Sequence, residues 1–260
     1  TDSDPDGVDD AVESGVGNLI GECNGDGNGD GIEDSTQVNV ASLPNSVTGS
    51  YVTVAADADI ALTNVVSTTT PSFDVALPED VEFPIGFTEF TADLPQGSDS
   101  TEITFYLDND AVFNAVYKFG FLPGQDPAVD EPSVFDFTYD AETGLGAQIF
   151  SDRIVLHLAD GQLGDLDGVV NGKIVDPIGL ALVPRIGDDY VGTNEDTPLT
   201  FDPLANDVVP GATIFATTTP LSGTVVINGD KLTYTPAADF YGEDSFEYTV
   251  TDSGGNQDTA

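Results

Sequence analysis

The chain has 260 residues, and its 47 acidic against 5 basic side chains give a formal net charge of −42. This charge repels nucleic acid and anionic membranes, and no apolar run has the length of a membrane span. Cys23 is the single cysteine, so an internal disulfide is excluded. The 39% of hydrophobic residues, with 15 Phe and 8 Tyr, suffice for packed cores. The acidic surplus is typical of a solubilising surface in a salty medium.

Two acidic loops of twelve residues open the chain, and both carry oxygen side chains at positions 1, 3, 5, 9 and 12. Gly7 and Gly31 fill position 6, and an aliphatic residue follows each, as in calcium loops that use a backbone carbonyl at position 7. The predicted calcium ligands of the first loop are Asp2, Asp4, Asp6, the Val8 carbonyl, Asp10 and Glu13. Those of the second are Asp26, Asn28, Asp30, the Ile32 carbonyl, Asp34 and Gln37. Because Gln37 replaces the bidentate glutamate, the second loop should bind more weakly.

The segments that flank these loops lack helical periodicity, which argues against a helix-loop-helix calcium sensor. The stretch CNGDGNGDGIED instead resembles thrombospondin type 3 repeats. That resemblance covers residues 1–37 and implies structural calcium in a stiffened stalk or connector. A solvated acidic turn is the alternative. Cys23 lies in this stretch as a small loop residue, a free thiol or a link to a second chain.

From residue 38 to residue 183 the sequence predicts short strands separated by Pro and Gly, the pattern of an all-β sandwich. The strands rich in β-branched and aromatic residues are expected at 50–55, 101–107, 115–119, 134–139 and 153–159. Residues 77–179 also resemble the choice-of-anchor U domain of bacterial surface and secreted proteins, through LPEDVEFPIGFTEF, NAVYKFGF and RIVLHLADGQLGDLDG. The tryptophan usual in that family is absent, which we interpret as a core substitution.

A third acidic, glycine-rich segment follows the strand at 153–159. It suits a third calcium site, and the alternative is an acidic hairpin held by Asx turns. The candidate ligands are Asp160, Asp165, Asp167, Asn171 and Asp176.

Residues 184–260 resemble the cadherin-like, tandem-95 type repeats of bacterial adhesins, which are immunoglobulin-like (Ig-like) sandwiches. A hairpin is expected at 223–235 around Asn228-Gly229-Asp230, and residues 245–251 alternate with Phe246, Tyr248 and Val250 on one face. The resemblance implies calcium at the repeat junction. The candidates are Asp188, Asp189, Glu195, Asp196 and Asp207, with Asp252 near the far end.

The final repeat stops just as its last strand should begin, at residues 257–260. A sandwich without an edge strand exposes unpaired backbone, which predicts either β-strand addition between subunits in a filament or a trimmed piece of a longer repeat protein. Subunit contacts would decide between the two.

Enzymatic chemistry has little support in the sequence. His157 is the only histidine, and it alternates with Ile154, Leu156 and Leu158, which predicts that it lies on the outer face of its sheet. One Cys and one His do not make a zinc site. Carboxylate pairs carry no signal in so acidic a chain.

These observations predict a secreted, cell-surface, non-enzymatic protein with three parts: calcium loops at 1–37, a β-sandwich at 38–183 and an Ig-like sandwich at 184–260. Its expected role is that of a calcium-stabilised structural subunit of an extracellular filament, surface layer or biofilm matrix, with self-association into a homopolymer. The alternative is a ligand- or glycan-binding or spacer module of a large secreted adhesin. Surface glycan is a candidate partner, and nucleic acid and membrane insertion are not expected.

Overall fold

The computed structural model describes residues 1–17, 25–71, 75–78, 81–107, 113–122, 125, 129–209, 211–252, 255 and 257–260. The chain forms two compact units, Thr1–Leu182 and Val183–Ala260. Within the described residues the helices are the four-residue α1 (Asp10–Glu13) and the three-residue 3₁₀ helix η1 (Asp34–Thr36). The predicted all-β fold class is confirmed. Cys23 lies outside the described residues.

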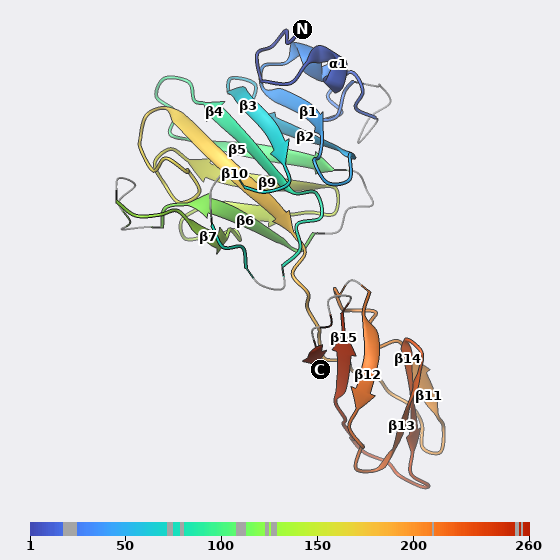
Figure 1. Cartoon of the computed structure of the whole chain (residues 1–260). Coiled ribbons are helices and arrows are strands. Elements are labelled where there is room, and N and C mark those ends of the chain that lie inside the picture. The colour runs from blue at the N-terminus through green and yellow to red at the C-terminus, as the bar shows by residue number, and fades with distance from the viewer. Residues whose placement is uncertain are drawn as a thin grey trace. The chain divides into compact units, whose positions relative to one another are not determined.

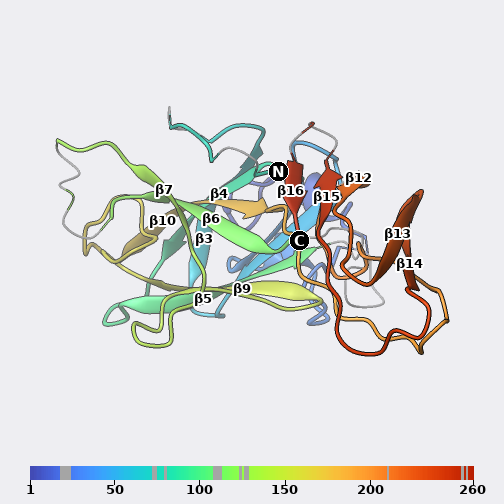
Figure 2. The same ribbon diagram turned by 90° about the horizontal axis from the view of Figure 1, so that it is seen from below.

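The first unit is a sandwich of two five-stranded sheets, in which every neighbouring pair of strands is antiparallel (Figure 1). One sheet has the order β1 (Val40–Pro44), β2 (Tyr51–Ala56), β5 (Ser100–Leu107), β9 (Arg153–Ala159), β8 (Gly146–Ile149). The other has the order β3 (Ala61–Thr68), β4 (Phe87–Asp93), β10 (Lys173–Ala181), β6 (Ala115–Gly120), β7 (Ser133–Asp136). In Figure 2, β5 and β9 lie in one layer, and β4, β6 and β10 lie in the other.

Alternating apolar side chains explain why these strands face each other across a core. On β5, Ile103 and Phe105 are fully buried, and on β9 the residues Ile154, Leu156 and Leu158 are buried in the same cluster. Period-two alternation places such residues on one face of a strand. His157 therefore lies on the outer face, as predicted, where its ring contacts that of Tyr139 in a tilted arrangement, with ring centroids 4.8 Å apart.

The acidic N-terminal segment packs onto this sandwich and belongs to the first unit. Val8 is part of the hydrophobic core, and the backbone N–H of Val65 on β3 donates to the carbonyl of Asp6 at 2.9 Å. The Tyr51 hydroxyl on β2 donates to the carbonyl of Val12 at 2.7 Å. A Cβ at Gly27 would stand 1.9 Å from the Thr53 hydroxyl oxygen, so the second loop approaches the sheet as closely as glycine permits. The segment predicted as a stiffened stalk or connector is thus packed against β1, β2 and β3.

The strand β10 was not predicted, and it includes Asp176, which the sequence placed in an acidic turn. The strand contains Pro177 and Gly179, two residues that weaken a strand pattern. Even-numbered residues of β10, among them Ile174 and Ile178, face the core. Asp176 is in phase with them and is completely buried.

The second unit is a smaller sandwich of two three-stranded antiparallel sheets. Its sheets have the orders β11 (Leu199–Phe201), β14 (Lys231–Pro236), β13 (Gly223–Asn228) and β12 (Thr213–Thr217), β15 (Tyr248–Thr251), β16 (Gln257–Thr259). Its core is built on Ile214, Leu232, Tyr248 and Val250. The alternation predicted for residues 245–251 is therefore confirmed for Tyr248 and Val250.

The predicted hairpin joins β13 to β14. Asn228 pairs with Lys231, so Gly229 and Asp230 form a two-residue turn, and Gly229 has a φ of 69°. Such a φ favours glycine, which explains its place at the first turn position. The short β16 pairs with β15 at the edge of its sheet. Strand addition from a neighbouring chain stays a prediction.

Candidate metal centre

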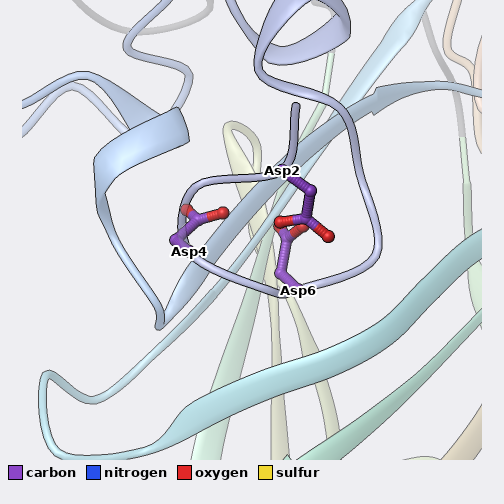
Figure 3. A group of neighbouring side chains, drawn as sticks. All are labelled: Asp2, Asp4 and Asp6. Carbon is purple, nitrogen blue, oxygen red and sulfur yellow. The ribbon is translucent and has the colours of Figure 1, made fainter.

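The first acidic loop brings three carboxylates to a common point. One oxygen each of Asp2, Asp4 and Asp6 lies within 4.8 Å of the others, and Figure 3 shows the three side chains pointing toward one another inside the loop. Among the described residues, no other three acidic, His or Cys side chains bring their ligand atoms this close together. Positions 1, 3 and 5 of the predicted loop therefore converge.

Burial makes this convergence unusual. Asp4, Asp6 and Glu13 are all buried, and both oxygens of Asp4, Oδ2 of Asp6 and Oε2 of Glu13 have no hydrogen-bond partner. Asp34 of the second loop is also fully buried, and its Oδ1 is unpartnered in the same way. A buried polar atom without a partner costs about 1–3 kcal/mol, and more when charged. Several such oxygens in one segment are acceptors that a cation could occupy.

Burial and neighbouring negative charges raise the pKa values of these acids. Burial, together with the charges of Asp4 and Asp2, raises the pKa of Asp6 to about 7. Burial and the charge of Asp6 raise the pKa of Glu13 to about 9. Burial also raises the pKa of Asp34 to about 6. Without a metal, the site therefore holds protons near neutral pH that a divalent cation would displace.

Backbone and side-chain contacts hold the first loop in shape. Asp10, the predicted ninth-position ligand, accepts hydrogen bonds from the N–H of Ser3 at 2.8 Å and from the hydroxyls of Thr1 and Ser3 at 2.9 Å. Oδ1 of Asp6 accepts from the N–H of Val8 at 2.7 Å. Asp10 thus closes the loop, and α1 presents Glu13 from the twelfth position to the buried side.

In the second loop, more of the predicted ligand oxygens accept hydrogen bonds from groups of the loop itself. Asp26 accepts hydrogen bonds from the N–H groups of Gly29, Asp30 and Gly31 at 2.8–3.1 Å. The Nε2 amide of Gln37 donates toward Asp30 at 3.3 Å and toward the Ile32 carbonyl at 3.4 Å. Asn28 Nδ2 donates to Asp30 at 3.2 Å. Amide donors thus occupy acceptor atoms that a calcium ion would need, which is consistent with the weaker second site expected from Gln37.

The strands beneath the loops contribute groups that the sequence did not reveal. Ser42 on β1 donates its hydroxyl to Asp34 at 2.5 Å, and its N–H donates to Glu13 at 3.3 Å. Gly27 N–H donates to Asp34 at 2.9 Å. Ser42 therefore links the two loops through one residue. No spacing rule could have found it, because the contact depends on tertiary packing.

The third acidic segment is held together by hydrogen bonds. Asp160 accepts from the N–H groups of Asn171 and Gly172, and Asp165 accepts from those of Gly161 at 2.8 Å and Val175 at 3.0 Å. The side-chain amide of Asn171 donates to Asp167 at 2.8 Å. Burial raises the pKa of Asp165 to about 6. Asp176 was predicted as a ligand of this segment, but it points into the core and pairs with Lys118. Calcium at this segment remains a prediction.

The acids expected at the repeat junction lie in the second unit. Asp207 accepts hydrogen bonds from the N–H of Gly187 at 2.8 Å and from the Tyr248 hydroxyl at 3.2 Å. Burial and the charges of Asp207, Asp202 and Asp188 raise the pKa of Asp189, and its Oδ2 is buried without a partner. Glu195 is exposed, and Asp196 accepts from the N–H of Asp239 at 3.0 Å. Asp189 and Asp207 are thus neighbours of Tyr248, whereas Asp188 is exposed.

Fold and site together define a β-sandwich protein with an acidic, all-oxygen candidate site for a hard cation. Residues 182–260 match the family model described as a bacterial Ig domain. The second unit is therefore a bacterial Ig-like domain, a kind of module that is often extracellular and found in surface or adhesin-like proteins. No helix among the described residues is long and apolar enough to cross a membrane.

One relative among curated proteins is Protein GAMETE EXPRESSED 2 of Arabidopsis thaliana, which is 41% identical over 75 residues. The match covers 28% of this chain and 8% of that protein. No solved structure matches the chain. The similarity therefore concerns a segment about as long as the second unit.

Proposed function

We propose that this chain is a calcium-stabilised, non-enzymatic structural module of an extracellular surface protein. The observation that carries the proposal is the convergence of Asp2, Asp4 and Asp6 beside buried, unpartnered oxygens of Asp4, Asp6 and Glu13. The bacterial Ig-like domain at residues 182–260 supports the surface role.

The donor set favours calcium over other metals. The side chains of Asp2, Asp4, Asp6 and Glu13 offer only carboxylate oxygens, the ligands of hard cations. Magnesium prefers a near-octahedral shell that retains several waters, whereas calcium accepts six to eight oxygens in flexible geometry. The first loop buries several acids and has a glutamate at position 12 that can offer both of its oxygens. It therefore suits the larger, flexible oxygen shell of calcium better than the hydrated shell of magnesium.

The ion would stabilise the packing of the N-terminal loop against the sandwich. Two carboxylates 4 Å apart repel each other by about 4 kcal/mol at an effective dielectric constant of 20. Calcium would replace that repulsion with attraction to all the acids at once. Since Glu13 also accepts from Ser42 on β1, the ion would hold α1 against the sheet. The proposed consequence is a rigid N-terminal end of the first unit.

Calorimetry tests this proposal on the full chain. The metal-free protein, prepared with EDTA and dialysed, should bind calcium in a titration and magnesium much more weakly. At calcium one hundred times its dissociation constant, binding stabilises by about 2.7 kcal/mol, which corresponds to a rise of about 5–10 °C in the melting temperature of the first unit. An identical melt in calcium and in excess EDTA at low salt would overturn the proposal.

Self-association into a filament, surface layer or matrix extends the proposal to the assembly. The edge position of β16 in its sheet supports strand addition, because β15 is its one neighbour among the described strands of the second unit. Light scattering across a range of protein concentrations, with calcium and with EDTA, tests it. A monomer at every concentration would exclude this extension and leave the calcium proposal intact.

A further inference from the structure

The core of the first unit contains a lysine and an aspartate that face each other with no exposed surface. Lys118 lies on β6 and Asp176 on β10, and the side chains of both are completely buried. In the register of these antiparallel strands, Lys118 is opposite Ile178, so Asp176 is its diagonal neighbour. The two form an ion pair. Long side chains reach across such a diagonal.

The surroundings of the pair are apolar. The Lys118 ammonium lies 5.0 Å from the centroid of the Phe137 ring, and Phe137 is itself buried. Asp176 is opposite the buried Phe90 on β4 and stands between Ile174 and Ile178 on its own strand. The covering loop leaves little room, because a Cβ at Gly164 would come within 2.8 Å of Phe137 and 3.3 Å of Lys118 Cε. Water is therefore excluded on the sides that these residues occupy.

Such an enclosure disfavours charge on both partners. Complete burial among apolar side chains destabilises the Lys118 ammonium and the Asp176 carboxylate, although each charge attracts the other. Transfer of one proton from the ammonium to the carboxylate converts the ion pair into an amine and a carboxylic acid. Asp165, the other carboxylate whose charge acts on Lys118, favours the ammonium form and opposes this transfer.

We propose that Lys118 and Asp176 form an intramolecular amide bond that covalently cross-links β6 to β10. The neutral Nζ of Lys118 attacks Cγ of the protonated Asp176, and the new C–N bond forms as a proton passes from Nζ to the departing hydroxyl. The C–O bond breaks and one water molecule leaves, so no other reactant is required. Fixed orientation of a desolvated amine against its electrophile gives the high effective concentration that such a step needs.

The cross-link would stabilise the first unit against unfolding. It joins two neighbouring strands in the middle of a sheet and would restrict the unfolded chain as a disulfide does, in a protein whose single cysteine excludes an internal disulfide. It is independent of the calcium proposed for the two N-terminal loops, because no residue of those loops takes part.

Mass spectrometry of the full chain, unfolded in acid with EDTA, tests the proposal. The expected mass is that of the sequence less one water molecule, and the mass of the unmodified sequence would overturn the proposal. Trypsin should fail to cut after Lys118, and the peptide 174–185 should be recovered attached to the peptide that contains Lys118. Separate, unlinked peptides would also overturn it.

Succinimides at Asp-Gly pairs such as Asp6-Gly7 lose water as well, so two variants separate the explanations. Lys118→Arg keeps the positive charge but removes the nucleophilic amine, and it should restore the full mass. Lys173→Arg alters the partly exposed pair of Lys173 with Asp93 and should retain the loss of water. Should Lys118→Arg retain that loss, the cross-link is refuted. If Lys118→Arg does not fold, the linked or unlinked peptides of the wild-type digest still distinguish the two explanations.

Discussion

At the scale of single residues, a substitution of Asp4 should have opposite effects on calcium binding and on the stability of the metal-free protein. Both oxygens of Asp4 are buried, so Asp4→Asn removes the negative charge while keeping the size of the side chain and one acceptor oxygen. Calcium affinity should fall at least tenfold, because one charged ligand of the converging three is lost. The metal-free protein should melt at a higher temperature, because repulsion from Asp2 and Asp6 is relieved. Titration and melting in EDTA measure the two effects.

The matched control for this prediction is Asp59→Asn. Asp59 lies exposed in the turn before β3. Its substitution removes one negative charge, as Asp4→Asn does, at a position outside the two loops. Both calcium affinity and the metal-free melt should stay within error of wild type. If Asp4→Asn lowers the melting temperature in calcium and in EDTA alike, Asp4 is only a structural residue and the metal centre loses its main support.

At the scale of elements, the second loop differs from the first chiefly at its twelfth residue. Gln37 donates hydrogen bonds to Asp30 and to the Ile32 carbonyl, where a glutamate would offer oxygens to a cation. Gln37→Glu should therefore strengthen calcium binding at the second loop, seen as a tighter second phase in a calorimetric titration. Gln96→Glu adds the same charge at an exposed turn between β4 and β5, outside the three acidic segments, and is the control. Equal effects of the two variants would assign the gain to net charge alone.

The second unit depends on one buried hydroxyl at its core. Tyr248 donates toward the carbonyl of Pro203 at 3.1 Å, the carbonyl of Gly187 at 3.3 Å and Asp207 at 3.2 Å. Tyr248→Phe leaves these acceptors with one donor fewer and should destabilise the second unit by about 1–2 kcal/mol. The control is Tyr241→Phe, since Tyr241 is 87% exposed. Calorimetry should show the loss in one transition only, and a shift in both would mean that the units unfold together.

The same scale shows which elements could be predicted from sequence. Strands β5, β9, β13 and β14 carry alternating apolar residues and were expected, because burial of one face imposes a period of two. The strand β10 was missed, because Pro177, Gly179 and the buried Asp176 contradict that pattern. Loop spacing placed Asp2, Asp4 and Asp6 in one site, whereas the contacts of Ser42 with both loops, and the pairing of Asp176 with Lys118, depend on packing between distant segments.

At the scale of the whole molecule, the raised pKa values predict how stability depends on pH. Glu13 and Asp6 have folded-state pKa values of about 9 and about 7 against ordinary values of 4.5 and 3.8. Between these limits the metal-free folded chain holds more protons than the unfolded chain, so its free energy of unfolding falls as pH rises. Calcium reverses the sign, because it binds the deprotonated acids and protons compete with it. The gap between the melting temperatures in calcium and in EDTA should therefore widen from pH 5.5 to pH 8.5.

This gap is a sharper measure than either melting curve alone. Groups outside the acidic segments titrate in the same way in both conditions, so their contributions cancel in the difference. Glu13→Gln removes the acid with the highest pKa in the site, so it should flatten the metal-free pH dependence and shrink the gap at pH 8.5 most. A gap that is the same at every pH in the wild-type protein would mean that calcium does not bind these acids, and that the buried carboxylates of the N-terminal loops remain protonated throughout.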